Sequence, residues 1–268
     1  MQFSFHKMHG LGNDFVVIDA RDTPVALTTA QVQAMADRHS GIGCDQLILI
    51  GPGEDTDVTM RIWNADGSEV QACGNATRCV PVLLGRDCTI QTPAGRLVAT
   101  LAEGGSSVDM GAPRFDWDAI PLAYPLDTHA LPTAWDSLAN PAAVNIGNPH
   151  LVFFVNALDT VPLGELGPRI ENDPLFPERI NVNVAQILDR THLRMATWER
   201  GAGLTRACGT GACATFAAGR RLGLLDARAR LDLPGGTLTL AESSEGHLLM
   251  SGPAVHVFSG HADLGYFG

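Results

Sequence analysis

The sequence predicts an α+β protein of two similar lobes, each with a mostly antiparallel sheet. An Ala-Cys-Gly motif occurs at Cys73 and again at Cys208, 135 residues later in a chain of 268 residues. A repeat over half the chain indicates internal duplication. The same offset aligns Trp63 with Trp198 and the stretch "GLGNDFVV" with "NIGNPHLV". After each motif, a Pro-x-Gly turn lies between alternating apolar residues, which is typical of a β-hairpin.

The first copy contains strand signals on both sides of a predicted helix. The stretches "FSFHKM", "FVVIDA", "QLILIG" and "VTMRIWN" are short, apolar and rich in β-branched or aromatic residues, which predicts strands. Thr28 or Thr29 is expected to cap a helix that reaches about His39. A second helix is expected to start just after Cys73, where small residues follow the motif.

The second copy repeats this order. The stretches "HLVFFV", "INVNVAQIL" and "HLRMATWE" predict strands. Helices are expected within Val161–Glu171 and from Gly209 to about Leu222. Residues 113–141 contain five prolines and little periodicity, which favours a linker that crosses between the copies.

The lobe boundaries follow from the repeat. We expect an N-terminal lobe of residues 1–115, joined by residues 256–268, and a C-terminal lobe of residues 116–255. The hydrophobic content of 45% with 18% charged residues is a normal globular balance.

Composition also narrows the partners and the compartment. The net charge of -11 argues against a nucleic-acid partner, because such binding needs a basic surface. No apolar run reaches the ~18 residues that a membrane helix needs, and the first residues lack the pattern of a signal peptide. We therefore expect a cytoplasmic protein that binds a small molecule and neither nucleic acid nor a membrane.

The six cysteines are not expected to form disulfides, because a chain without an export signal meets reducing thiols. No Cys-x-x-Cys pair occurs, which argues against a zinc ribbon or a thioredoxin-type site. Cys44, Cys79, Cys88 and Cys213 are expected to be small packing residues.

The two Cys-Gly pairs have a chemical meaning. A thiol at a helix N-terminus meets unpaired N–H groups and the positive end of the helix dipole, which should lower its pKa towards neutrality. Gly74 and Gly209 let the backbone approach a ligand closely. Paired lobes would present Cys73 and Cys208 to opposite faces of one carbon. Inversion of a stereocentre requires this arrangement: one thiolate removes the α-proton while the other thiol delivers a proton.

No cofactor and no metal are expected. Lys7 is the only lysine, so a pyridoxal-phosphate racemase would have this single Schiff-base candidate in a loop without the usual cofactor features. His6, His9 and His39 show no metal-ligand spacing. A cofactor-free reaction of two cysteines is the better account.

The motifs "KMHGLGNDF", "GCDQLILI", "NADGSEVQACGNATRC", "GNPH", "FPERINVN" and "WERGAGLTRACGTGAC" resemble those of the diaminopimelate epimerase family over nearly the whole chain. The resemblance implies lobes in which each sheet wraps round a central helix, and usually a homodimer. It implies cofactor-independent interconversion of LL- and meso-diaminopimelate in lysine and peptidoglycan precursor biosynthesis. It carries over Cys73 and Cys208 as the acid/base pair, with His150 and Glu199 tuning the thiol pKa values. The implied substrate-binding residues are Asn13, Gln46, Asn64, Gly74, Asn75, Asn148, Asn181, Glu199, Arg200, Gly209 and Thr210.

These positions suit a diamino diacid, whose two zwitterionic ends need carboxamides that both donate and accept. The repeat breaks at Asn64, which aligns with Glu199, and at Ala65, which aligns with Arg200. A guanidinium suits the distal carboxylate and a carboxyl group suits an ammonium. One departure is Phe258, where relatives often carry a tyrosine associated with the dimer interface.

Other functions remain open at this point. Proline and hydroxyproline racemases belong to the same superfamily, but cyclic imino acids would not call for the Arg200 and Glu199 pair. Phenazine-type isomerases lack the two-cysteine arrangement. A redox-sensing binding protein is a third possibility, because facing thiols of low pKa can oxidise.

Overall fold

The computed structural model describes residues 1–71 and 73–268; Ala72, in the motif "QACGNATRC", lies outside the described residues. The chain forms two compact units. The N-terminal unit consists of Met1–Val108 and Gly252–Gly268, and the C-terminal unit of Asp109–Ser251.

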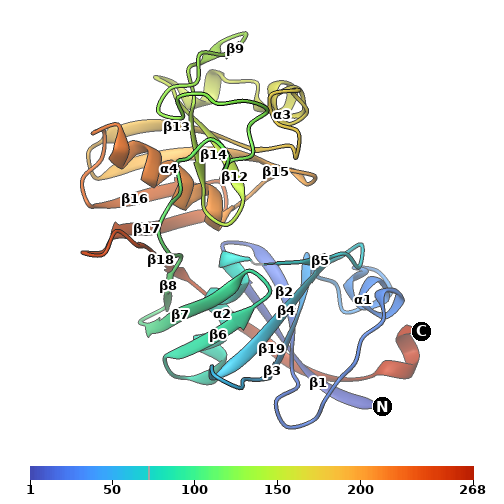
Figure 1. Cartoon of the computed structure of the whole chain (residues 1–268). Coiled ribbons are helices and arrows are strands. Elements are labelled where there is room, and N and C mark those ends of the chain that lie inside the picture. The colour runs from blue at the N-terminus through green and yellow to red at the C-terminus, as the bar shows by residue number, and fades with distance from the viewer. Residues whose placement is uncertain (72) are drawn as a thin grey trace. The chain divides into compact units, whose positions relative to one another are not determined.

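The N-terminal unit is a mostly antiparallel sheet with two α-helices (Figure 1). Its elements are β1 (Gln2–Gly10), β2 (Asn13–Asp19), α1 (Thr29–Ala36), β3 (Gln46–Pro52), β4 (Val58–Asn64), β5 (Glu69–Val70), α2 (Gly74–Leu84), β6 (Cys88–Thr92), β7 (Gly95–Ala102), β8 (Gly105–Asp109), β19 (Val255–Asp263) and the 3-10 helix η2 (Leu264–Phe267). Strand β1 pairs antiparallel with β19 and β2, whereas β2 and β3 are parallel. Strand β4 pairs antiparallel with β3 and β5 and parallel with β6, which forms a hairpin with β7.

The C-terminal unit repeats this pairing scheme. Its elements are β9 (Ala134–Trp135), β10 (Leu138–Ala139), β11 (Ala142–Asn145), β12 (Pro149–Phe154), the 3-10 helix η1 (Leu158–Thr160), α3 (Leu163–Glu171), β13 (Asn181–Asp189), β14 (His192–Glu199), β15 (Gly203–Thr205), α4 (Gly209–Arg221), β16 (Arg228–Leu233), β17 (Gly236–Glu242) and β18 (Leu248–Pro253). Strands β12 and β13 are parallel, as are β14 and β16, and the remaining neighbours in this series are antiparallel.

Strand register confirms the duplication. Phe15 pairs with Gln46 in the N-terminal unit and His150 with Asn181 in the C-terminal unit, so both partners differ by the predicted 135 positions. After the helix that follows each motif the offset becomes 141, since the β6–β7 hairpin closes at Thr92 and the β16–β17 hairpin at Leu233.

A buried helix lies at the centre of each unit. Helix α2 contacts β1, β6, β7 and β19, and α4 contacts β11, β12, β13 and β17. Both helices are rich in small residues, and most of their residues are buried. Small side chains let the strands approach the helix from several sides, because close packing needs short side chains on at least one partner. The α+β fold class with a sheet wrapped round a central helix in each unit is therefore confirmed.

Three local predictions need correction. Lys7, predicted to lie in a loop, is within β1 and pairs with Val16 of β2, because the apolar alternation of this strand continues past it. Helix α1 has the predicted cap, Thr28, which forms a capping box with Gln31. It ends at Ala36 rather than near His39, because Asp37 Oδ1 accepts from the backbone N–H groups of the next turn.

Residues 113–141 are not a bare linker. The segment contributes five buried side chains to the core of the C-terminal unit: Ile120, Leu122, Leu131, Trp135 and Leu138. Their irregular spacing hid this role, because neither helix nor strand periodicity marks them.

Candidate active site

Cys73 and Cys208 occupy the same local position in the two units. Cys73 is the N-cap of α2 with φ -145° and ψ 112°, and Cys208 is the N-cap of α4 with φ -124° and ψ 112°. Gly74 and Gly209 are the first residues of the two helices and are buried. Each cysteine therefore lies at the end of a helix whose first backbone N–H groups have no intrahelical partners, and the sulfur of Cys208 accepts from one of them, the N–H of Gly211.

The surroundings of Cys73 are carboxamides. The Cys73 thiol donates to Asn13 Oδ1 over a sulfur–oxygen distance of 3.9 Å, and Asn75 Nδ2 donates to the same oxygen over 3.2 Å. Asn75 is almost fully buried. Two of the predicted binding residues thus lie together with the first predicted acid/base residue.

Cys208 lies in a drier and more acidic environment. The backbone N–H of Gly211 donates to its sulfur over 3.4 Å, and Thr210 Oγ1 lies 3.6 Å from it. Burial and the nearby charge of Glu199 raise the pKa of the Cys208 thiol well above its ordinary value, despite the opposing hydrogen bonds from Thr210 and Gly211. The predicted lowering of this pKa was wrong, because desolvation of the thiolate outweighs the helix terminus.

Glu199 is the acidic neighbour of this thiol. Thr205 Oγ1 donates to Glu199 Oε1 over 2.5 Å. Burial raises the pKa of Glu199, while hydrogen bonds from Thr205 and Cys208 act in the opposite direction. A carboxyl group of raised pKa beside a thiol couples the two titrations.

His150 is completely buried and is bonded through both ring nitrogens. Asn183 Nδ2 lies 3.1 Å from its Nδ1 and also donates to the carbonyl of Leu151 over 2.9 Å. Because Asn183 is the donor, His150 Nδ1 accepts, and Nε2–H donates to Asn148 Oδ1 over 2.8 Å. Burial, with the charge of Arg200, lowers the pKa of His150 to about 3, so the ring is neutral.

Of the remaining predicted residues, Gln46 and Asn64 lie together. Gln46 Nε2 donates to Asn64 Oδ1 over 3.0 Å. The Oε1 atom of Gln46 is buried and has no hydrogen-bond partner among residues 1–71 and 73–268. A buried oxygen of this kind is costly unless a ligand donates to it.

Asn181 and Arg200 lie together in the C-terminal unit. The backbone N–H of Arg200 donates to Asn181 Oδ1 over 3.0 Å, and Arg200 Nη1 donates to the carbonyl of Glu178 over 2.8 Å. Within the described part of the chain, Arg200 forms no ion pair with a carboxylate. Its guanidinium therefore retains donors for an anionic ligand.

Sequence reasoning missed several residues that support this chemistry. Asn183, fully buried, accepts from Thr197 Oγ1 over 3.0 Å and connects that hydroxyl to His150. Its position two residues after Asn181 was the available signal, because alternate residues of a strand share one face. Asp45, next to Gln46, was missed as well; its Oδ2 accepts a hydrogen bond from Asn13 Nδ2 over 3.1 Å.

The other cysteines have packing roles. Burial raises the pKa of Cys44 and Cys88 to about 11 and that of Cys79 to about 12, and Cys213 is fully buried. In the described residues, no group of three or more His, Cys, Asp or Glu side chains could hold a metal ion. None of the helices described is long and apolar enough to cross a membrane.

Solved structures share this fold. A phenazine biosynthesis protein of the PhzF family from Bacillus anthracis matches with a TM-score of 0.69 and 17% identity, over 98% of this chain and 99% of that chain. A hydroxyproline epimerase from Agrobacterium vitis, with bound trans-4-hydroxy-L-proline, matches with a TM-score of 0.68 and 16% identity, over 97% of this chain and 91% of that chain. These likenesses define the class of fold, two-lobed and α+β.

Closer relatives define the family. The sequence model of diaminopimelate epimerase matches residues 5–115 and 142–257. The diaminopimelate epimerase of Zymomonas mobilis subsp. mobilis is 62% identical over 100% of both chains, and that of Rhizorhabdus wittichii is 60% identical over 100% of this chain and 98% of that protein. The chain belongs to the diaminopimelate epimerase family, as the motifs indicated.

Proposed function

We propose that this protein is a cofactor-independent epimerase that interconverts LL- and meso-diaminopimelate, with Cys73 and Cys208 as its two bases. One cysteine, as thiolate, removes the α-proton, and the other, as thiol, delivers a proton to the opposite face. In the reverse direction the two residues exchange roles. The reaction needs no oxidant or reductant, because a proton leaves and a proton returns.

The observation that carries this proposal is the pair of repeat-related cysteines at helix N-termini in a chain of this family. The free backbone N–H groups at the start of each helix would offset negative charge developing on the substrate carboxylate during proton removal. The raised pKa of Cys208 is compatible with a resting thiol. Ionisation of that thiol would then accompany binding of the substrate, because its α-ammonium group favours a nearby thiolate.

Further residues support a diamino diacid as the substrate. Gln46 Oε1, buried and without a donor in the described residues, suits one ammonium group. The guanidinium of Arg200 suits the distal carboxylate, and Asn64 and Asn181 supply carboxamides on the respective units. A ligand that contained a single zwitterionic end would leave part of this set without partners, at a cost of about 1–3 kcal/mol for each buried polar group.

The test is exchange of the α-proton in deuterated water. Wild-type protein should incorporate deuterium into both isomers of diaminopimelate, and dialysis against a chelator should not change the rate. Cys73→Ala and Cys208→Ala should each abolish epimerisation in both directions, while Cys213→Ala serves as a matched thiol control. Ordinary epimerisation by either of the first two variants would refute the two-base assignment.

We also propose that the protein acts in the cytoplasm, in lysine and peptidoglycan precursor synthesis, and as a homodimer. Phe258 on β19 supports the dimer, because this residue is 47% exposed while its ring packs edge-on against Phe5 with centroids 6.1 Å apart. Sedimentation equilibrium should give the mass of two chains.

A further inference from the structure

Four side chains of the N-terminal unit form a hydrogen-bonded series beside Cys73. Arg78 Nη2 donates to Asn75 Oδ1 over 3.0 Å, and Asn75 Nδ2 donates to Asn13 Oδ1 over 3.2 Å. Asn13 Nδ2 then donates to Asp45 Oδ2 over 3.1 Å. We call Arg78, Asn75, Asn13 and Asp45 the amide relay.

The two ends of the amide relay fix the direction of both carboxamides. A guanidinium only donates and a carboxylate only accepts, whereas a carboxamide does either. Because Arg78 must face the oxygen of Asn75, the nitrogen of Asn75 faces Asn13. Because Asp45 must face the nitrogen of Asn13, the oxygen of Asn13 faces Asn75 and the Cys73 thiol.

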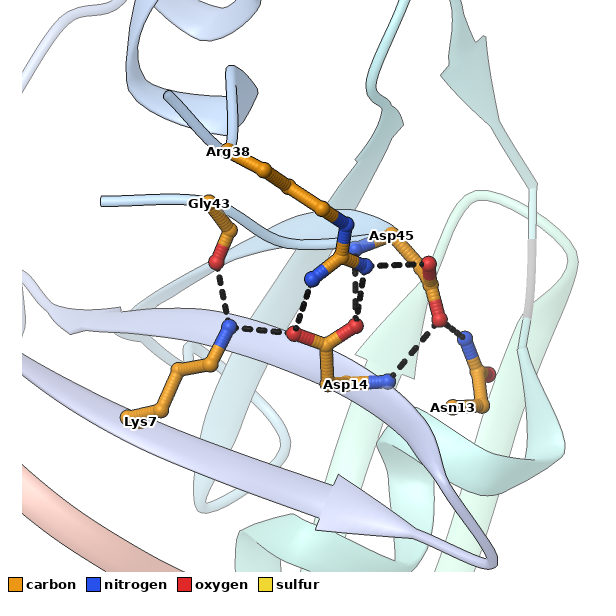
Figure 2. Close-up of polar contacts among 6 residues, drawn as sticks. All are labelled: Lys7, Asn13, Asp14, Arg38, Gly43 and Asp45. Atoms are coloured by element: carbon orange, nitrogen blue, oxygen red, sulfur yellow. Dashed lines mark hydrogen bonds and ion pairs between the residues drawn. The ribbon is translucent and has the colours of Figure 1, made fainter. Parts of the chain in front are cut away.

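Both ends are held firmly. Arg78 has no exposed surface, and its Nε donates to the carbonyl of Pro253 over 3.4 Å. A β-carbon at Gly10 would lie 3.0 Å from Arg78 Nη2, so the glycine leaves room for this guanidinium. At the other end, Arg38 Nη2 donates to Asp45 Oδ1 over 2.7 Å (Figure 2).

Asp45 is further tied to Asp14, as Figure 2 shows. The backbone N–H of Asp14 donates to Asp45 Oδ2 over 3.1 Å, and that of Asp45 donates to Asp14 Oδ1 over 3.2 Å. Arg38 bridges both carboxylates, and Lys7 pairs with Asp14 while also donating to the carbonyl of Gly43. Burial opposes ionisation of Asp14, but hydrogen bonds from Arg38 and Lys7 outweigh it and hold the pKa of Asp14 far below its usual range.

We propose that Asp45 and Arg78 are positioning residues that hold the carbonyl oxygen of Asn13 toward Cys73 and thereby keep Cys73 in its thiol form before substrate binds. An acceptor beside a thiol stabilises the protonated state, whereas an N–H group in the same place would stabilise the thiolate. Cys73 then rests as a proton donor. The consequence for turnover rests on the proposed function, but the effect on the thiol itself does not.

The test is the pH dependence of Cys73 alkylation by iodoacetamide in the free protein. Trypsin releases Cys73 as the sole cysteine of the peptide spanning residues 62–78, so mass spectrometry follows this thiol separately. In Asp45→Asn, the new carboxamide can donate to Asn13 and allow its amide to turn. The midpoint of the profile should fall by about one pH unit, which is a roughly tenfold rise in thiolate fraction below the midpoint.

The matched control is Asp14→Asn, which removes the same charge from the same cluster but leaves Asp45 in contact with Asn13. If amide direction matters, Asp45→Asn shifts the midpoint well beyond Asp14→Asn. Equal shifts would mean that charge alone acts, and the proposal would be overturned. An unshifted profile in Asp45→Asn would overturn it too.

A second comparison uses Asn13→Ala as the background. Without the carboxamide at position 13, Asp45→Asn and Asp14→Asn should shift the Cys73 midpoint equally; a persisting difference would contradict the relay. Asp45 is exposed at the surface, and thermal unfolding verifies that each variant is folded. Wild-type protein that fails to exchange the α-proton of diaminopimelate would refute the proposed function, while the alkylation profiles would still decide on the amide relay.

Discussion

Gly211, in the first turn of α4, is the position at which the smallest substitution should disturb Cys208. A β-carbon there would lie 2.5 Å from Asn183 Oδ1 and 3.3 Å from the sulfur and β-carbon of Cys208, whereas ordinary van der Waals contact begins at 3.4 Å. Asn183 cannot turn away freely, since it is buried and bonded to His150, Leu151 and Thr197. Gly211→Ala must therefore displace either this amide or the cysteine.

The net effect on stability combines opposing terms. Alanine is favoured over glycine within a helix by about 1 kcal/mol. Overpacking a dense core costs about 1–3 kcal/mol, and each buried hydrogen bond broken at Asn183 adds about 1–3 kcal/mol. With one such bond broken, we expect Gly211→Ala to be destabilised by about 1–5 kcal/mol, which lowers the unfolding temperature by about 2–4 °C for each kcal/mol.

Thermal unfolding and Cys208 alkylation measure the two consequences. Gly164→Ala, in helix α3 of the same unit, is the matched control. A β-carbon at Gly164 would meet only Leu204 Cδ1, at the ordinary contact distance of 3.5 Å. The control should be as stable as wild type or slightly more stable. Our reasoning is refuted if Gly211→Ala unfolds at or above the wild-type temperature with an unchanged rate of Cys208 alkylation.

Two further predictions concern charged residues of the C-terminal unit. Glu199→Gln should lower the pKa of Cys208, because the substitution removes a negative charge that raises this pKa. Alkylation of Cys208 should therefore begin at lower pH than in the surface control Glu165→Gln. An onset at higher pH would contradict the influence of Glu199 on this thiol. Arg200→Leu should reduce kcat/KM for diaminopimelate roughly 10- to 100-fold, as expected for a charged hydrogen bond of about 1.5–3 kcal/mol. Arg169→Leu, which breaks an exposed ion pair, should retain wild-type kcat/KM. Wild-type activity of Arg200→Leu would show that Arg200 does not bind the distal carboxylate.

Local signals in the sequence predicted much of the fold. The strands β4 and β14 match their predicted stretches, and both central helices begin directly after Cys73 and Cys208. These features depend on periodicity and capping within a few residues, which the sequence displays. The burial of residues 113–141 depends on contacts with distant strands, and no local pattern encodes such contacts.

The site was less predictable than the fold. The sequence placed Cys208 correctly at a helix N-terminus, but it gave no measure of desolvation, and burial with Glu199 reverses the direction of the pKa shift. Likewise, the sequence identified Asn13 and Asn75 as candidates without showing which end of each amide faces Cys73. That direction depends on Asp45 and on Arg78.

The repeat-related amides Asn13 and Asn148 show how a duplicated unit becomes asymmetric. Asn13 presents its oxygen to Cys73, because Asp45 takes its nitrogen. Asn148 has its oxygen occupied by the Nε2–H of neutral His150, which leaves its nitrogen as the donor.

Two exchanges between the copies account for this inversion. His150 aligns with Phe15, and Asp45 aligns with Ile180, and both of these apolar counterparts are fully buried. Each unit thus has one polar residue bonded to its asparagine, Asp45 or His150, at a position where the other unit has an apolar residue. The same carboxamide becomes an acceptor in one unit and a donor in the other. The proposed substrate has two chemically alike ends, and this difference between the carboxamides, like the replacement of Ala65 by Arg200, makes the two units unequal toward it.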